Sequence, residues 1–427
     1  MQGEVLIVRF ERDGRRVHPM VLRNGLFLAL VVGLVSNLAG ESKRYFKGNT
    51  HAHSLWSDGN DFPEMVIDYY HRSGYDFAVV SDHDVMAEGY RWMSISDINA
   101  RQMAEGPGAI EKCIARFGAD WMEWREVEGS PGIVLKTLAE FREQFEAPGE
   151  FLILKAEEIS NTSSSGPIHI NALNLEREIA HVNRPDWSAE TVIREALQAV
   201  QRQEEEIGRP ILTHLNHPNY LWAVTAEDIA AVVEEQFFEV YNGHPLINHL
   251  GDETRPGDEQ IWDIANTIRI AKMGEAPLYA VATDDSHWYH GGNVSPGRGW
   301  IMVAAEKLES DALMVAMRAG DFYASSGVTL NVISYDSASR MIEIEIAEDG
   351  DAGFESRLIG TRSGYEKVKG KRGIGEVFAT QTGRKVQFVV PADALYARVM
   401  IISSTDHPNP SFEEQKKQAW TQPVGWK

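Results

Sequence analysis

The feature that most constrains this chain is a regular alternation of short apolar runs with helical patterns, which continues to about residue 322. Such alternation is typical of a parallel sheet, and about six to eight strand–helix units favour a barrel. The helical stretches carry ordinary start signals, such as Asp61 as a cap and Pro63 in a first turn. The apolar runs predict strands over Tyr45–His53, Phe77–Asp82, Phe151–Ile159, Ile168–Leu175, Ile211–His217, Phe237–Asn242, Leu278–Asp284 and Trp300–Ala304.

Two stretches depart from this alternation. Residues 86–150 are longer than one crossover needs and combine several tryptophans with many charges, so we interpret them as a helical insertion. Beyond residue 325 the pattern changes to a period of two, as in Ile342–Ile346, and Phe412–Gln418 is the one helical stretch of useful length. We therefore predict an α/β barrel domain over residues 41–324 and a small all-β sandwich over residues 325–427.

Residues 1–40 have the layout of a secretory signal peptide. Leu26–Val35 is an apolar run of ten residues, with arginines before it and the small-residue stretch SNLAG after it. A membrane span needs about 20 apolar residues, so this run is too short to be one. Met20 begins a compact signal by itself, and we expect it to be the true start, with cleavage near Gly40. The mature chain would then be periplasmic or extracellular without a membrane span; an uncleaved N-terminal anchor is the alternative.

Composition excludes several classes of function. The net charge of −22 leaves no basic surface for a phosphate backbone, so we expect no nucleic-acid partner. The single cysteine, Cys113, can form neither an intrachain disulfide nor a CxxC zinc site. Any metal must therefore be held by histidine, aspartate and glutamate.

These three residue types gather at the ends of the predicted strands. His51 and His53 lie two residues apart, so their side chains share one side of a strand. In parallel barrels the catalytic residues gather at the carboxyl ends of the strands, and packing does not explain so many polar residues there. Further candidates along the chain are Asp58, Asp82, His83, Asp84, Glu157, Glu158, His169, His214, His217, Asp284, Asp285 and His287.

This set of side chains narrows the choice of metal. Imidazoles together with carboxylates suit zinc, manganese or iron, whereas calcium avoids imidazole. The candidates outnumber the ligands of one ion, so we expect two or three divalent ions. Ions about 3.5–4 Å apart lower the pKa of a shared water and stabilise an anionic transition state. The sequence thus predicts a hydrolase in which a metal-bridging hydroxide attacks a small-molecule ester.

Several motifs occur in the order found in the PHP (polymerase and histidinol phosphatase) metallohydrolases: HAHSLWSDG, VVSDHD, KAEEIS followed by HINAL, LNHPN and DDSH. Over about residues 45–427 the chain resembles that family, and PGRGW, GDFYASSGV and AWTQP resemble its secreted, carbaryl-hydrolase-like branch. The resemblance implies a distorted (β/α)7 TIM-like barrel, up to three metals and phosphoesterase activity. Its implied metal ligands are His51, His53, Asp58, His83, Glu158, His169, His217, Asp285 and His287.

Some roles stay open. His214 could replace His217, because both end one predicted strand. Arg298 could clamp a substrate phosphate through its guanidinium, or form an ordinary loop salt bridge. Either His287 or an acid such as Asp84 could protonate the leaving group. The candidate catalytic residues are therefore His287, Asp285 and Arg298.

Three alternatives to a phosphoesterase remain. The same site could hydrolyse a carbamate, an amide or a carboxyl ester. Lys155 with His169, His217 and Asp285 could be fitted to an amidohydrolase with a carboxylated lysine, although SDHD and the closing DxH fit that template poorly. A non-catalytic envelope protein with structural metals and a glycan-binding β-domain is the third. Structural zinc sites close their coordination shell, so the surplus of ligands argues against it. The sequence leaves substrate and oligomeric state undetermined.

Overall fold

The computed structural model describes residues 43–102, 105–291, 293, 295–365 and 373–426. From Lys43 onward the chain forms one compact unit. The expected signal segment, residues 1–40 with Met20, lies outside the described residues, so export and cleavage stay predictions. Across the described ranges, none of the helices has both the length and the apolar character needed to cross a membrane.

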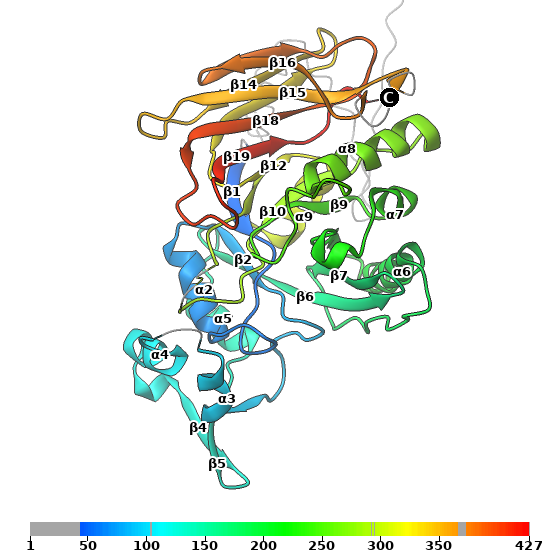
Figure 1. Cartoon of the computed structure of the whole chain (residues 1–427). Helices are drawn as coiled ribbons and strands as arrows, with labels where there is room; N and C mark the ends of the chain where they lie inside the picture. Colours follow the sequence, from blue (N-terminus) through cyan, green and yellow to red (C-terminus); the bar gives the residue numbers. More distant parts are fainter. Residues whose placement is uncertain (1–42, 103–104, 292, 294, 366–372, 427) are drawn as a thin grey trace, which may run out of the picture. The chain divides into compact units, whose positions relative to one another are not determined.

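One mixed sheet of 13 strands runs through most of the described chain (Figure 1). A run of seven strands forms one part of it, with β11 (Trp300–Ala305) beside the first of them. In sheet order, the seven are β1 (Arg44–Asn49), β2 (Phe77–Val80), β6 (Leu152–Ser163), β7 (Gly166–Leu173), β8 (Leu212–Leu215), β9 (Phe237–Asn242) and β10 (Tyr279–Thr283). Each expected strand is present, and the mixed α/β class is confirmed.

The direction of β7 departs from expectation. Neighbours such as β2 and β6, or β9 and β10, are parallel, but β7 runs antiparallel to both β6 and β8. Only Ser164 and Ser165 join β6 to β7, which allows a hairpin, whereas a parallel crossover needs a dozen or more residues. A wholly parallel sheet is therefore wrong here. Because β7 is reversed, its first half lies beside the end of β6.

The two ends of the seven-strand run meet. Ala52, just after β1, forms a parallel bridge with Ser286, just after β10. The backbone N–H of His53 donates to the carbonyl of Ser286 at 2.9 Å. The polar residues that follow these two strands are thereby brought side by side. A seven-stranded barrel requires such a meeting; the barrel itself stays a prediction.

Helices link most of the seven strands: α2 (Pro63–Arg72), α6 (Ala189–Ile207), α7 (Ala226–Ala231) and α8 (Asp258–Ile268). A further helix, α9 (Ser310–Arg318), follows β11. The helix start signals act as expected, since Pro63 begins α2 and the Ser188 side chain accepts the N–H of Thr191 at the start of α6. Apolar residues of α6, α7 and α8 share a core with β9, whereas α9 packs in a second cluster with β1 and β2.

Residues 86–150 are mixed rather than purely helical. They contain α3 (Ile95–Ala100), α4 (Ala109–Phe117), η1 (Ala119–Trp121), α5 (Leu138–Phe145) and an antiparallel sheet of β3 (Trp92–Ser94), β5 (Ser130–Val134) and β4 (Glu123–Val127). Glu128 and Gly129 turn the β4–β5 hairpin with φ of +52° and +78°. Glutamate is not a usual residue for this turn, so the local sequence gave little hairpin signal.

The rest of the chain is antiparallel. The large sheet continues through β12 (Phe322–Ser325), β19 (Lys416–Thr421), β18 (Ala394–Asp406), β15 (Phe354–Arg362) and β16 (Glu376–Thr382). A second sheet contains β13 (Leu330–Asp336), β14 (Met341–Ile346) and β17 (Lys385–Val389), and apolar residues of both sheets share one core. The large sheet runs across residue 325, and the domain boundary placed there stays a prediction. The helix expected over Phe412–Gln418 is absent; β19 begins there and pairs with β12 and β18.

Candidate metal centre

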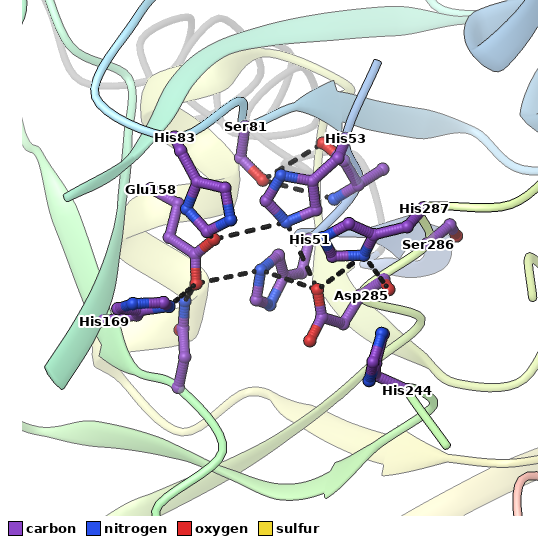
Figure 2. A network of polar contacts seen from close by, with 12 residues as sticks. His51, His53, Ser81, His83, Glu158, His169, His244, Asp285, Ser286 and His287 are labelled. Atoms are coloured by element: carbon purple, nitrogen blue, oxygen red, sulfur yellow. Dashed lines mark hydrogen bonds and ion pairs between the residues drawn. The ribbon is translucent and has the colours of Figure 1, made fainter. Parts of the chain in front are cut away.

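The nine side chains predicted as metal ligands meet in one cluster, just after the ends of β1, β2, β8 and β10 and along β6 and β7. Figure 2 labels all of them except Asp58 and His217. Glu158 of β6 lies at its centre and is buried. Five imidazoles surround its carboxylate. Oε1 lies 3.2 Å from His51 Nε2, 3.1 Å from His169 Nδ1 and 3.4 Å from His217 Nε2, and Oε2 lies 3.2 Å from His53 Nε2 and 2.9 Å from His83 Nδ1.

The register of β6 and β7 explains why Glu158 rather than Glu157 faces the cluster. Glu158 pairs with Asn171, and His169 is two residues away on the same face of β7. Glu157 faces the opposite side, where its carboxylate accepts the N–H of Ile179 at 2.5 Å. Burial raises the pKa of Glu157 to about 8.

A second carboxylate, Asp285, completes the inner part. Its Oδ1 lies 3.2 Å from Nε2 of both His51 and His53, and 3.5 Å from Nδ1 of His287. Asp285 and His217 have left-handed backbones, with φ of +47° and +25°. Such conformations are costly for residues with a Cβ and cluster at functional sites.

Asp58 closes the cluster on its exposed side. Its carboxylate lies 3.3 Å from Nε2 of His287 and 3.6 Å from Nε2 of His83. The side chain of Asp58 is 54% exposed, whereas those of Glu158 and Asp285 are buried. Solvent therefore reaches the cluster from the side of Asp58.

Three overlapping groups of these residues could each hold a metal ion. Each group places one ligand atom per residue within 4.8 Å of the others. They are His53, Asp58, His83 and His287; His51, His53 and Glu158; and His83, Glu158 and His169. Because Glu158 belongs to two groups, its two oxygens could bridge two ions.

Buried donor atoms in the cluster test the fit to a cation. Nε2 of His51 and His53, Oε2 of Glu158 and Nδ1 of His169 are buried without a hydrogen-bond partner. Buried polar atoms are normally hydrogen-bonded, so four in a single place whose nearest polar neighbours are one another's ligand atoms, without hydrogen-bond geometry, need an explanation. Imidazole nitrogens and carboxylate oxygens that converge in this way suit a divalent transition-metal ion.

Charges in the cluster hold one another ionised. Burial would raise the pKa of Glu158, but nearby histidines, His51 foremost, hold it well below its usual range. Burial would lower the pKa of His83, yet Glu158 and Asp58 raise it to about 11. Metal ligands must be deprotonated, so a cation bound here would displace protons from the imidazoles.

Residues behind the ligands orient them. Glu239 of β9 lies 2.7 Å from Nδ1 of His51, which leaves Nε2 of that ring facing Glu158. Glu239 also accepts the N–H of His217 at 2.8 Å, and Asn216 donates to Glu158 Oε1 at 2.7 Å. Such partners fix the tautomer and direction of a ligand. The sequence analysis missed Glu239, although a lone acid within the buried strand FFEVYN was a signal.

His214 and the candidate acids Asp82, Asp84 and Asp284 have other contacts; the Asp84 carboxylate accepts the N–H of Ser160 at 2.8 Å. The ring of His214 lies behind His51, with Nδ1 3.9 Å from Glu239, so the geometry favours His217 beside Glu158. Asp82 accepts the N–H groups of Ser54 and Ser57 and holds the turn after His53. Asp284 accepts the backbone N–H groups of residues 297–299.

The guanidinium of Arg298 is buried among loop oxygens. It donates to the carbonyl of Gly243 at 2.8 Å, to Oδ1 of Asn293 at 2.8 Å and to the carbonyl of Asn409 at 3.2 Å. Only 2% of the residue is exposed. These contacts favour a role for Arg298 in holding the loops together over a role as a phosphate clamp. Its partners are carbonyl and amide oxygens, not the carboxylate that a loop salt bridge would have.

Comparisons with known proteins add little. No family model matches the chain. No curated protein matches it either. Among solved structures, a two-domain protein from Bacteroides vulgatus ATCC 8482, containing a predicted PHP-like metal-dependent phosphoesterase, is 15% identical, with 90% of this chain and 96% of that chain covered and a TM-score of 0.40. A protein from Bifidobacterium adolescentis ATCC 15703, assigned as a metal-dependent phosphoesterase, is 12% identical, with 64% and 94% covered and a TM-score of 0.31. Neither likeness is close enough to carry an argument.

Proposed function

We propose that this chain is an exported metal-dependent phosphoesterase of the PHP type, built on a distorted (β/α)7 barrel. It would bind two or three zinc, manganese or iron ions and hydrolyse a small-molecule phosphoester. The observation that carries the proposal is the set of buried ligand atoms on His51, His53, Glu158 and His169, which converge on one another without a hydrogen-bond partner. Residues 1–40 and the branch-specific motifs support export and the carbaryl-hydrolase-like branch.

Each part of the cluster has a role in this proposal. Ions bound there would supply a water of lowered pKa and positive charge for an anionic transition state. Glu158 would set the spacing of two ion positions, and Glu239 would hold the ring of His51 in place. The ester would approach from the solvent-exposed side, beside Asp58. His287 lies in the exposed ligand group, so we assign it to metal binding rather than to protonation of the leaving group.

The test is hydrolysis by the full chain loaded with Mn²⁺ or Zn²⁺. We would compare p-nitrophenyl phosphate, bis(p-nitrophenyl) phosphate and p-nitrophenyl acetate, in the wild type and in Asp285→Ala. Turnover of a phosphoester that is lost in Asp285→Ala supports the proposal. Glu235→Gln, which changes a buried acid outside the ligand groups, is the matched control and should keep activity.

The same assay separates the alternatives. Turnover of the carboxyl ester alone would replace the phosphoesterase with a carboxyl-ester, carbamate or amide hydrolase. Metal binding without any turnover would favour the non-catalytic binding protein. Unchanged turnover in Asp285→Ala would remove the cluster from the reaction.

A further inference from the structure

Three leucines stand out on the surface. Leu221, Leu246 and Leu250 are 63%, 62% and 71% exposed. Among the described residues, no other leucine is as exposed as these three. Leu221 belongs to the segment after β8, and Leu246 and Leu250 to the segment after β9. We call these three residues the apolar rim.

The two segments that carry the apolar rim are tied together. The side chain of Asn219 donates to the carbonyls of Asn248 at 3.1 Å and of Pro256 at 3.0 Å. The side chain of Asn248 donates back to the carbonyl of Asn219 at 2.9 Å. Each leucine lies two residues from one of these asparagines, so the reciprocal bonds hold the three leucines in one region.

The backbone at Leu221 is costly for the fold. Leu221 and Trp222 have left-handed φ values of +50° and +61°, which glycine or asparagine adopts more readily. An exposed leucine gains little from burial, so neither packing nor backbone preference explains this residue. Strain without a folding benefit is typical of segments shaped for binding.

The apolar rim borders the metal-ligand cluster. Tyr220, next to Leu221, has its ring 5.4 Å from that of His217 and 6.4 Å from that of His169. On the other segment, the ring of His244 lies 5.1 Å from that of His287. The N–H of Leu246 donates to Nδ1 of that same His244 at 3.2 Å. Each segment therefore connects an exposed leucine to an imidazole of the cluster through one aromatic residue.

We propose that the apolar rim binds an alkyl or aryl group of the substrate while its ester group lies on the metal cluster. This inference rests on the proposed function and narrows its substrate class to phosphoesters with an apolar substituent. Three leucines offer on the order of a few hundred Å², well below the roughly 800 Å² that each partner buries in a stable protein interface. The rim therefore suits a small apolar group rather than a second protein surface.

The experiment uses the full chain loaded with Mn²⁺ and a series of n-alkylphosphonates from methyl to heptyl, with affinity measured by calorimetry. We expect the affinity of the wild type to rise by up to about fourfold for each methylene that the rim covers. In the double variant Leu221→Ser/Leu246→Ser this dependence on chain length should flatten, while methylphosphonate binds as before. Val315→Ser is the matched control, because Val315 is 61% exposed on α9, which packs in another cluster.

A second variant guards against misfolding. Leu221→Gly removes the side chain and relieves the left-handed φ, which offsets the entropic cost of a glycine, so the melting temperature should hold while the affinity for heptylphosphonate falls. Equal affinity along the series, with methylphosphonate bound and phosphoester turnover intact, would overturn the proposal that the apolar rim binds an alkyl group. The proposed function would then still stand. No binding and no turnover would overturn both. A serine variant that changes the oligomeric state but keeps the chain-length dependence would make the rim an interface between copies.

Discussion

Nδ1 of His51 lies 2.7 Å from Oε1 of Glu239, while Nε2 of the same ring lies 3.2 Å from both Glu158 and Asp285. The imidazole of His51 thus lies between two kinds of acid. Glu239 contacts only Nδ1 and can orient the ring, whereas Glu158 and Asp285 lie beside Nε2, the nitrogen that faces the cluster. Glu239 is fully buried and also accepts the Thr283 hydroxyl at 2.6 Å. The position of His51 therefore depends on β9 and β10 as well as on β1.

Glu239→Gln should weaken metal binding without removing a ligand. Glutamine keeps the shape of the side chain but loses the charge that holds the His51 tautomer. Loss of such an orienting partner typically costs about 10–100-fold in metal affinity. Competition with a chromophoric chelator measures this, and Glu235→Gln on the segment before β9 is the control. Equal affinities in Glu239→Gln and the wild type would show that packing alone fixes His51.

Metal stoichiometry should separate the three ligand groups. Asp58 belongs to one group and Glu158 to two. Asp58→Asn should therefore lower the number of bound ions by one, and Glu158→Gln should lower it by up to two. Elemental analysis after gel filtration gives the count. An equal loss in both variants would mean that the groups fill as a single unit.

Removal of metal should lower stability. A ligand that binds only the folded chain stabilises it by about 2.7 kcal/mol when present at 100 times its dissociation constant. Dialysis against EDTA should therefore lower the melting temperature, and Zn²⁺ or Mn²⁺ should restore it. In Asp285→Ala the same treatment should change the melting temperature less, which distinguishes the cluster from adventitious surface binding.

Sequence periodicity predicted the strands and most of the cluster because both depend on local pattern. Apolar runs that end in polar residues specify where a chain enters and leaves a sheet, so His53 and His83 could be placed at strand ends. The spacing of two residues likewise put His51 and His53 on one side. The orientation of β7 was not predicted, since it depends on the length of a two-residue connection rather than on hydrophobicity.

Other features were invisible because they depend on distant partners. In the sequence, Glu239 is an acid without a partner inside an apolar strand. Its partner, His51, lies 188 residues earlier, so only the fold brings the two together. Arg298 looks like a free cation until Gly243 and Asn409 surround its guanidinium. The helix expected over Phe412–Gln418 gives way to β19, because two neighbouring strands offer hydrogen bonds that the isolated segment lacks.

The unfolding free energy should depend on pH through Glu235. Burial raises its pKa from 4.5 to about 7. Between these values the folded chain keeps a proton that the unfolded chain has released, so stability falls as pH rises and levels off above pH 7. Glutamine does not titrate, so the unfolding free energy of Glu235→Gln should rise by up to about 3 kcal/mol relative to the wild type across that range. Urea unfolding at pH 5 and pH 8 measures the difference, and parallel pH profiles would contradict it.

Arg298→Lys tests whether this residue holds loops or binds substrate. Lysine keeps the charge but cannot reproduce the three-way donation to Gly243, Asn293 and Asn409. Buried carbonyls left unpaired cost about 1–3 kcal/mol each, so the variant should lose at least about 2 kcal/mol of unfolding free energy. KM for the phosphoester should stay within about twofold, because the guanidinium is occupied by the loops. A large rise in KM with unchanged stability would instead identify Arg298 as a phosphate clamp, and the loop contacts would then be ones that substrate displaces.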